Sequence, residues 1–289
     1  MTIAVVGATG NTGRAVVKEL RQLGQDPLCV VRNADKAREV LGANAKTAIA
    51  ELMDRAALAK ALSGIDSVFL VTGHNPQMGE QQGNVIEAAA QAGVKHLVRL
   101  SAGRAVAAAD SPTRVGRAHH AVDEKMRGGK IGWTILRPGL FMQNVMAQAS
   151  AIKSESKIVM PYAADFPLAL IDVRDTGAVA ARILIAPAAH AGKTYEFTGA
   201  LTNYGEFAEM FSQVLGRKIS YVGVSVEQNE QAMKARGMPD WLIAHLVGIA
   251  RVGRAGGFST ENTQPIHDIV KRAPLTTRQF VEDYKGAFG

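Results

Sequence analysis

Apolar runs alternate with segments of helical periodicity along the first hundred residues. Strands that alternate with helices are joined by crossovers and lie parallel in one sheet. The segments TIAVV, SVFLV and HLVRL are nearly continuous apolar runs, as expected where helices cover both faces of a sheet. The pattern therefore predicts an α/β, doubly wound parallel sheet, with strands over 2–6, 27–32, 46–51, 66–72 and 95–101 and helices over 11–24, 34–41, 55–62 and 78–92.

The pattern changes after Ser101. A Gly/Ala/Arg/Pro stretch leads to a helix over 115–128 and a strand over 131–136, and from about 150 the elements become shorter. We predict a first domain over 1–150 and a smaller, mixed, mostly helical region over 151–289 that acts as a substrate lid, with part of 156–200 returning to the main sheet. Its expected elements are a strand near 156–160, a strand at TYEFT, and helices over 175–185, from Asn203, over 240–252 and over 277–288.

A glycine-rich loop stands directly after the first strand and before the first helix. Residues 7–13 read Gly-Ala-Thr-Gly-Asn-Thr-Gly. In this setting Gly7 permits the tight turn, Gly10 lets the backbone approach a pyrophosphate, and Gly13 lets the helix pack against the strand. The phosphates are then favoured by the unpaired N–H groups and the dipole at the helix N-terminus. The loop predicts a Rossmann-type dinucleotide site.

The end of the second strand indicates which dinucleotide binds. A carboxylate there would accept hydrogen bonds from a ribose 2′-OH, whereas a cation favours a 2′-phosphate. The strand ends in Val31, Arg32 and Asn33, and Lys36 follows one turn later. We expect NADPH as the cofactor, with NADH bound more weakly. The alternative is that Arg32 and Lys36 are ordinary solvated cations at the sheet edge.

Three segments together resemble a known family: GATGNTGR at the start, VVRNADKA after the second strand, and TILRPGLFMQN after the sixth. On these motifs the chain resembles the NmrA-like branch of the atypical short-chain dehydrogenase/reductases. That branch includes NADPH-dependent quinone reductases, flavin-free azo-dye and triarylmethane-dye reductases, and redox-sensing regulators that bind NADP without turnover.

The resemblance implies a set of contact residues. It puts Ser101 and Pro138 beside the nicotinamide, and it turns Phe141 and Asn144 toward the substrate. Phe141 as a core residue and Asn144 as a turn cap remain alternatives. The full set of cofactor residues expected on this basis and from the loop is Gly7, Thr9, Gly10, Asn11, Thr12, Gly13, Arg32, Lys36, Thr72, Gly73, Ser101, Pro138 and Phe141.

The helix after the fifth strand lacks the usual proton-transfer pair. Short-chain dehydrogenases place Tyr-x-x-x-Lys there, because the lysine lowers the pKa of the phenol. No tyrosine occurs between Ser101 and Arg137. His119 and Asp123 share a helix face, so the carboxylate could orient the imidazole and raise its pKa. We therefore name Ser101, His119 and Asp123 as catalytic candidates, with a structural role for His119 as the alternative.

An electron-poor acceptor needs less help from a protein acid. Quinones, azo bonds and triarylmethane cations can take a hydride directly if the ring lies over the nicotinamide. Apolar side chains, among them Met146 and Tyr162, are candidates to line a pocket for flat aromatic rings. We expect a flavin-free NADPH-dependent reductase of such acceptors. The alternative is an NADP(H)-binding redox sensor without turnover.

Charge and composition limit the remaining classes of partner and cofactor. The net charge is +7, but the basic residues are dispersed and have no interleaved aromatics, which disfavours nucleic acid as a partner. A local excess at Arg99, Arg104, Arg114 and Arg117 could favour an anionic acceptor or could be a solvated surface. Scattered histidines and a single cysteine argue against a metal. We expect a cytoplasmic monomer or homodimer that does not associate with membranes.

Overall fold

The computed structural model describes residues 1–289 and divides into two compact units. The first unit comprises Met1–Pro138, Val173–Glu196 and Pro265–Arg272, and the second comprises Gly139–Asp172, Phe197–Gln264 and Ala273–Gly289. The first segment of the first unit ends with the sixth strand, at Pro138, whereas the boundary was predicted at residue 150. No helix of the chain is both long and apolar enough to cross a bilayer.

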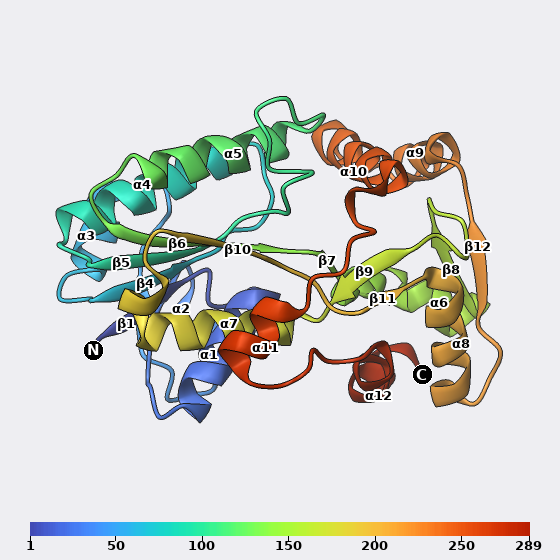
Figure 1. Cartoon of the computed structure of the whole chain (residues 1–289), viewed down its shortest axis with the longest axis horizontal. Helices are drawn as coiled ribbons and strands as arrows, with labels where there is room; N and C mark the ends of the chain where they lie inside the picture. The colour runs from blue at the N-terminus through green and yellow to red at the C-terminus, as the bar shows by residue number, and fades with distance from the viewer. The chain divides into compact units, whose positions relative to one another are not determined.

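The first unit contains a seven-stranded sheet in the order β10-β6-β5-β4-β1-β2-β3, a doubly wound α/β arrangement of Rossmann type. The six strands β1 to β6 pair in parallel. Helices α3, α4 and α5 cover one face, and α1 and α7 lie on the other (Figure 1). The elements are β1 (Ile3–Val6), α1 (Asn11–Gln22), β2 (Leu28–Val31), α2 (Ala34–Leu41), β3 (Thr47–Ile49), α3 (Arg55–Ala61), β4 (Ser67–Leu70), α4 (Met78–Gln91), β5 (His96–Leu100), α5 (Arg114–Arg127), β6 (Gly132–Pro138), α7 (Val173–Ile185), a 3-10 turn over Pro187–His190, β10 (Lys193–Phe197) and α11 (Gln264–Val270).

Alternation along the strands explains why both faces of this sheet are covered. Successive side chains of a strand point to opposite faces. Ala4 and Val6 belong to an apolar core that includes Leu58, Val85 and Val122 of the helices α3, α4 and α5. Val5, between them, is also fully buried. The predicted near-continuous apolar strands are thus confirmed, with ends within a few residues of the predicted ones.

Helix α7 follows the second unit's first segment in sequence but belongs to the first unit, where it packs closely on α1. A Cβ added at Gly177 would lie 2.7 Å from the Cβ of Ala15, so the glycine permits this approach. Since α1 begins at the glycine-rich loop, its close support by α7 helps to hold the loop in place.

The second unit is smaller and combines short strands with helices. A three-stranded mixed sheet has the order β11-β9-β7, and β12 pairs in parallel with β8. Asn203 accepts a hydrogen bond from the Glu206 N–H at 2.8 Å and so caps α8, the helix predicted to start there. The elements are β7 (Leu140–Phe141), a 3-10 helix over Met142–Gln148, α6 (Ala149–Glu155), β8 (Lys157–Met160), β9 (Leu168–Ile171), β11 (Leu201–Thr202), α8 (Tyr204–Leu215), β12 (Ser220–Gly223), α9 (Val226–Ala235), α10 (Asp240–Val252), a π-helical turn over Gly253–Gly257 and α12 (Thr277–Phe288).

Candidate functional site

The glycine-rich loop connects β1 to α1 by a turn in which two glycines are required. Gly7 has φ +83°, and a Cβ there would overlap the Val71 carbonyl oxygen. A Cβ at Gly13 would overlap the Gly7 carbonyl oxygen and approach the Cα of Ala8 to 2.8 Å. The Gly10 N–H donates to the Gly7 carbonyl at 3.1 Å and closes the turn. These contacts fix a compact loop ahead of the helix.

The N-terminus of α1 leaves backbone donors for a ligand. Gly10 is the N-cap residue and offers no side-chain acceptor to the first turn. The first N–H groups of a helix have no partner within the helix, and the helix dipole favours an anion beside them. Gly10 and Asn11 are exposed, while Thr12 and Gly13 are buried. The exposed start of α1 therefore fits a pyrophosphate.

Two cations at the end of β2 fit the 2′-phosphate of NADPH. Arg32 and Lys36 are exposed and form no ion pair. Arg38, on the same helix α2, instead pairs with Asp35 at 2.6 Å. The backbone of Lys36 is fixed because its N–H donates to Asn33 Oδ1 at 2.9 Å, which caps α2. The residues present thus fit the phosphorylated dinucleotide.

The remaining cofactor candidates of the first unit follow the ends of neighbouring strands. Thr72 is half-buried and Gly73 exposed after β4, while Ser101 is buried directly after β5 and Pro138 is buried at the end of β6. Ligands of open parallel sheets bind outside the carboxyl ends of the strands. The structure therefore brings these four residues to the same sheet edge as the glycine-rich loop.

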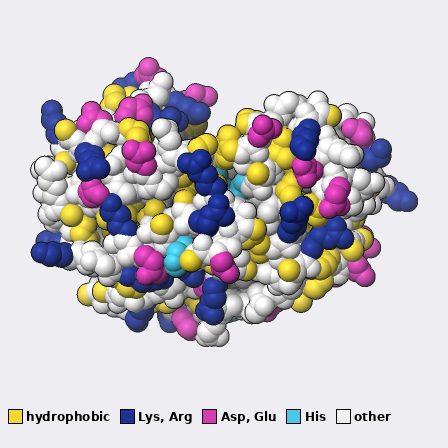
Figure 2. All heavy atoms as spheres, turned by 90° about the horizontal axis from the view of Figure 1, so that it is seen from above, with side chains coloured by type: hydrophobic (Ala, Val, Ile, Leu, Met, Phe, Trp, Pro, Cys, Tyr) yellow, Lys and Arg dark blue, Asp and Glu magenta, His cyan; other side chains and the backbone are white.

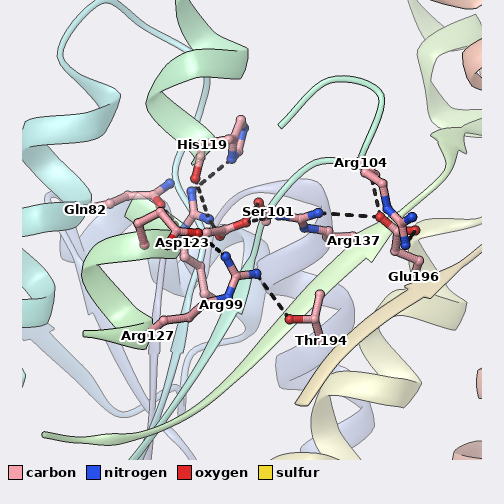
Figure 3. Close-up of polar contacts among 11 residues, drawn as sticks. Gln82, Arg99, Ser101, Arg104, His119, Asp123, Arg127, Arg137, Thr194 and Glu196 are labelled. Carbon is pink, nitrogen blue, oxygen red and sulfur yellow. Dashed lines mark hydrogen bonds and ion pairs between the residues drawn. The ribbon is translucent and has the colours of Figure 1, made fainter. Parts of the chain in front are cut away.

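A buried ion pair lies beneath this edge. Arg99 of β5 and Asp123 of α5 are in direct contact, and both side chains are completely buried. Asp123 Oδ2 also accepts hydrogen bonds from the Ser101 hydroxyl at 2.9 Å and from Arg137 at 2.8 Å. Burial lowers the pKa of Arg99 to about 10, and Asp123 opposes this shift, so the guanidinium is charged at neutral pH. One carboxylate thus holds two buried cations and one hydroxyl (Figure 3).

Asp123 and His119 both contact the same guanidinium group. Arg99 joins them, because it pairs with Asp123 and also approaches His119 Nδ1 at 2.9 Å. A guanidinium can only donate, so Nδ1 of His119 accepts and carries no proton. In the structure Arg99 therefore stands between the Asp123 carboxylate and the His119 imidazole, and the catalytic roles named for His119 and Asp123 stay predictions.

The four arginines of the local basic excess do not form one anion site. Arg99 is a strand residue and is ion-paired, Arg104 pairs with Glu196 at 3.2 Å, and Arg117 donates to the Ser111 carbonyl at 2.6 Å. Arg114 is exposed. On the face drawn in Figure 2, basic side chains lie among acidic ones and form no continuous basic surface.

The predicted substrate residues belong to the second unit. Phe141 is half-buried in β7, and Asn144 is exposed in the following 3-10 helix. Tyr162 is 5% exposed, belongs to the apolar core and stacks on Tyr204 at a centroid distance of 5.8 Å. Burial raises the pKa of the Tyr162 phenol to about 12. The structure thus shows Tyr162 packed in the apolar core of the second unit, and its contact with a substrate stays a prediction.

Sequence reasoning missed two members of the buried cluster, Gln82 and Arg137. It placed Arg99 in the strand over 95–101 but grouped it with the arginines of the following segment as a possible anion site. A signal was present, because Arg99 stands between Val98 and Leu100 and Arg137 directly follows Ile135 and Leu136, within buried strands. A charge in a buried strand must be paired to offset its desolvation. No group of three or more His, Cys, Asp or Glu side chains is placed to hold a metal.

Known proteins resemble the chain over nearly its whole length. It is 34% identical over 291 residues to an NAD(P)H azoreductase of Xenophilus azovorans, covering 99% of both chains. It is 31% identical over 288 residues to a (4-alkanoyl-5-oxo-2,5-dihydrofuran-3-yl)methyl phosphate reductase of Streptomyces griseus, again covering 99% of both.

Among solved structures, an NADPH-dependent quinone oxidoreductase of Escherichia coli, in complex with NADPH, superposes with a TM-score of 0.85 at 27% identity. The match covers 98% of this chain and 100% of that one. The model of the NmrA-like family matches residues 1–273. With this match over most of its length, the chain belongs to the NmrA-like family.

Proposed function

We propose that this protein is a flavin-free reductase that uses NADPH to reduce electron-poor aromatic acceptors of the quinone, azo or triarylmethane type. One observation carries the proposal. The chain combines a glycine-rich loop and two cations that fit NADPH with a helix, α5, that lacks the Tyr-Lys pair. His119 and Asp123 of that helix are bound to the buried Arg99. An acceptor that takes a hydride without a protein acid suits this arrangement.

The bound cofactor would supply the hydride, and the side chains would supply position and electrostatics. The exposed N-terminus of α1 binds the pyrophosphate, Arg32 and Lys36 bind the 2′-phosphate, and Ser101 lies at the nicotinamide end. Holding two reactants in a geometry close to that of the transition state can remove a large part of the activation barrier. The azoreductase and quinone oxidoreductase relatives support aromatic acceptors.

The test is NADPH oxidation against a panel of quinones, azo dyes and triarylmethane dyes, with no flavin added. We expect turnover with at least one class and no dependence on added FMN or FAD. Binding of NADPH without turnover of any acceptor would overturn the reductase and favour the alternative, a redox sensor.

A sulfonated and a neutral acceptor belong in the same panel. The named substrate of the Streptomyces relative carries a phosphate, which supports an anionic acceptor. Of the four arginines, Arg114 is exposed and forms no ion pair, whereas Arg104 is exposed but pairs with Glu196, so Arg114 is the main source of such a preference. An advantage of the sulfonated acceptor that declines with salt is the expected result. Equal salt dependence for both acceptors would contradict it.

Replacing Arg32 with aspartate is expected to reverse the preference for NADPH over NADH. The change removes a cation from the 2′-phosphate and adds a carboxylate that suits a ribose 2′-OH. The expected loss of NADPH binding is about 1–3 kcal/mol, the scale of a hydrogen bond to a charged group. Dissociation constants for NADPH and NADH, measured for each variant, give the answer.

The matched control is Arg38→Ala, on the helix α2 that follows Arg32. Arg38 is exposed like Arg32 but is already paired with Asp35. We expect its removal to leave the NADPH/NADH ratio unchanged. If Arg32→Asp also left the ratio unchanged, the account of the β2 end would be wrong.

A further inference from the structure

The buried cluster of the first unit is a directed hydrogen-bond chain that connects two expected cofactor residues. It runs from Thr72 after β4, through Gln82 of α4, Arg99 of β5 and Asp123 of α5, to Ser101 after β5. Figure 3 shows Gln82, Arg99, Asp123 and Ser101 turned toward one another from three different elements. Because Arg99 and Asp123 are fully buried, water does not offer them alternative partners.

The ion pair fixes the direction of every bond in this chain. Arginine has donors and no acceptor, and an ionised carboxylate has acceptors and no donor. At one end, the Ser101 hydroxyl therefore has to donate its hydrogen to Asp123 Oδ2, at 2.9 Å. Because the Ser101 hydrogen is used in the bond to Asp123, Ser101 can offer only oxygen lone pairs to a ligand.

The opposite direction holds at the other end. Arg99 Nε donates to Gln82 Oε1 at 2.6 Å, which fixes which end of the amide faces the arginine. The Gln82 NH₂ group then donates to Thr72 Oγ1 at 2.7 Å. Thr72 accepts from inside, so its own hydroxyl hydrogen is left to donate to a different group.

We propose that the Arg99–Asp123 pair gives the two cofactor-side hydroxyls opposite polarities, with Ser101 accepting from the carboxamide N–H of NADPH and Thr72 donating to an oxygen of its nicotinamide-side ribose or of the phosphate attached to that ribose. This inference rests on the proposed binding of NADPH. The carboxamide is the N–H donor of the nicotinamide end, and the ribose and pyrophosphate supply oxygen acceptors. Asp123 and Gln82 are positioning residues that act through Ser101 and Thr72.

The experiment measures binding, without any acceptor. Three ligands are titrated: NADPH, its reduced 3-acetylpyridine analogue, which has a methyl ketone in place of the carboxamide and so no N–H, and adenosine 2′,5′-bisphosphate, which lacks the nicotinamide half. We expect the wild-type protein to bind NADPH about five- to tenfold more tightly than the analogue, the value of one neutral hydrogen bond.

Ser101→Ala tests the acceptor end. This substitution is expected to weaken the binding of NADPH by that same factor and to leave the affinity for the analogue unchanged. The discrimination between the two ligands is then lost. Ser67→Ala is the matched control, since Ser67 is a buried serine at the start of the neighbouring strand β4, far from the carboxyl edge. We expect it to keep the discrimination intact. Discrimination retained by Ser101→Ala would overturn the proposed acceptor.

Thr72→Val tests the donor end. This substitution is expected to weaken the binding of NADPH and of the analogue equally, because both ligands share the oxygen that Thr72 contacts. Gln82→Met should have the same effect, and the double variant should be no weaker than Thr72→Val alone, because Gln82 acts through Thr72. Additive effects would overturn the positioning role of Gln82, and an unchanged affinity in Thr72→Val would overturn the donor.

The third ligand separates this inference from the proposed function. Adenosine 2′,5′-bisphosphate should bind the wild type and all these variants alike. If the wild type bound neither this ligand nor NADPH, the proposed function would fail. If it bound both, but showed no preference for NADPH over the analogue, only the inference would fail.

Discussion

Alanine in place of Gly13 is expected to abolish measurable NADPH binding and to lower the free energy of unfolding of the first unit by about 2–4 kcal/mol, within the range of overpacking in a closely packed site. The added Cβ would overlap the Gly7 carbonyl oxygen and meet the Cα of Ala8 at 2.8 Å. Both neighbours are backbone, so relief requires the loop itself to move. NADPH titration and urea denaturation measure the two effects.

Two other glycines supply controls for this substitution. Gly79 lies inside α4, and a Cβ there would contact the Ala118 Cβ at an ordinary 3.5 Å, so Gly79→Ala should match or exceed wild-type stability. A Cβ at Gly10 would also stand 3.5 Å from its nearest neighbour. Gly10→Ala should therefore keep the wild-type stability but weaken the binding of NADPH. Wild-type stability and affinity in Gly13→Ala would contradict the close approach at Gly13.

Asparagine in place of Asp123 is expected to cost about 3–5 kcal/mol of stability, the range found when a buried ion pair loses one partner. The substitution leaves the guanidinium groups of Arg99 and Arg137 buried together without the carboxylate that they share. Because both side chains are at least nine-tenths buried, added salt should not restore the loss. Urea denaturation at low and high salt measures it.

Arg137→Met is the informative comparison, because it removes a cation from the same cluster. Arg99 and Asp123 then remain as a balanced pair, and the expected cost is about 1–2 kcal/mol, that of a lost hydrogen bond and its packing. The prediction is therefore an asymmetry between two substitutions at one carboxylate. Equal costs, or a larger cost for Arg137→Met, would show that net buried charge does not control the stability of this site.

Local patterns were sufficient for most elements of the first unit. The bounds predicted for α2 agree with the structure, and those of the other helices differ by a few residues. Gly7, Gly10 and Gly13 were placed correctly because a strand, a turn and a helix adjoin in sequence, so their requirements are local. Arg32 and Lys36 follow the same logic at the end of β2.

Contacts between distant residues were not accessible in this way. Asp123 was paired with His119, its neighbour one helical turn away, but its ion pair is with Arg99, 24 positions earlier in the chain. Tyr162 was assigned to a pocket, since a pattern of aromatic and Met residues does not distinguish a lined cavity from a filled core. The structure places it against Tyr204, in another element of the second unit.

The sequence by itself determined the order of strands and helices, the glycine-rich turn and the cationic end of β2, because each depends on residues within a few positions of one another. Only the tertiary structure decided that Arg99, Asp123 and Ser101 form one buried, directed cluster and that the first run of the first unit ends at Pro138. Hydrogen-bond direction depends on which side chains of separate elements meet, and that is settled by how the elements pack.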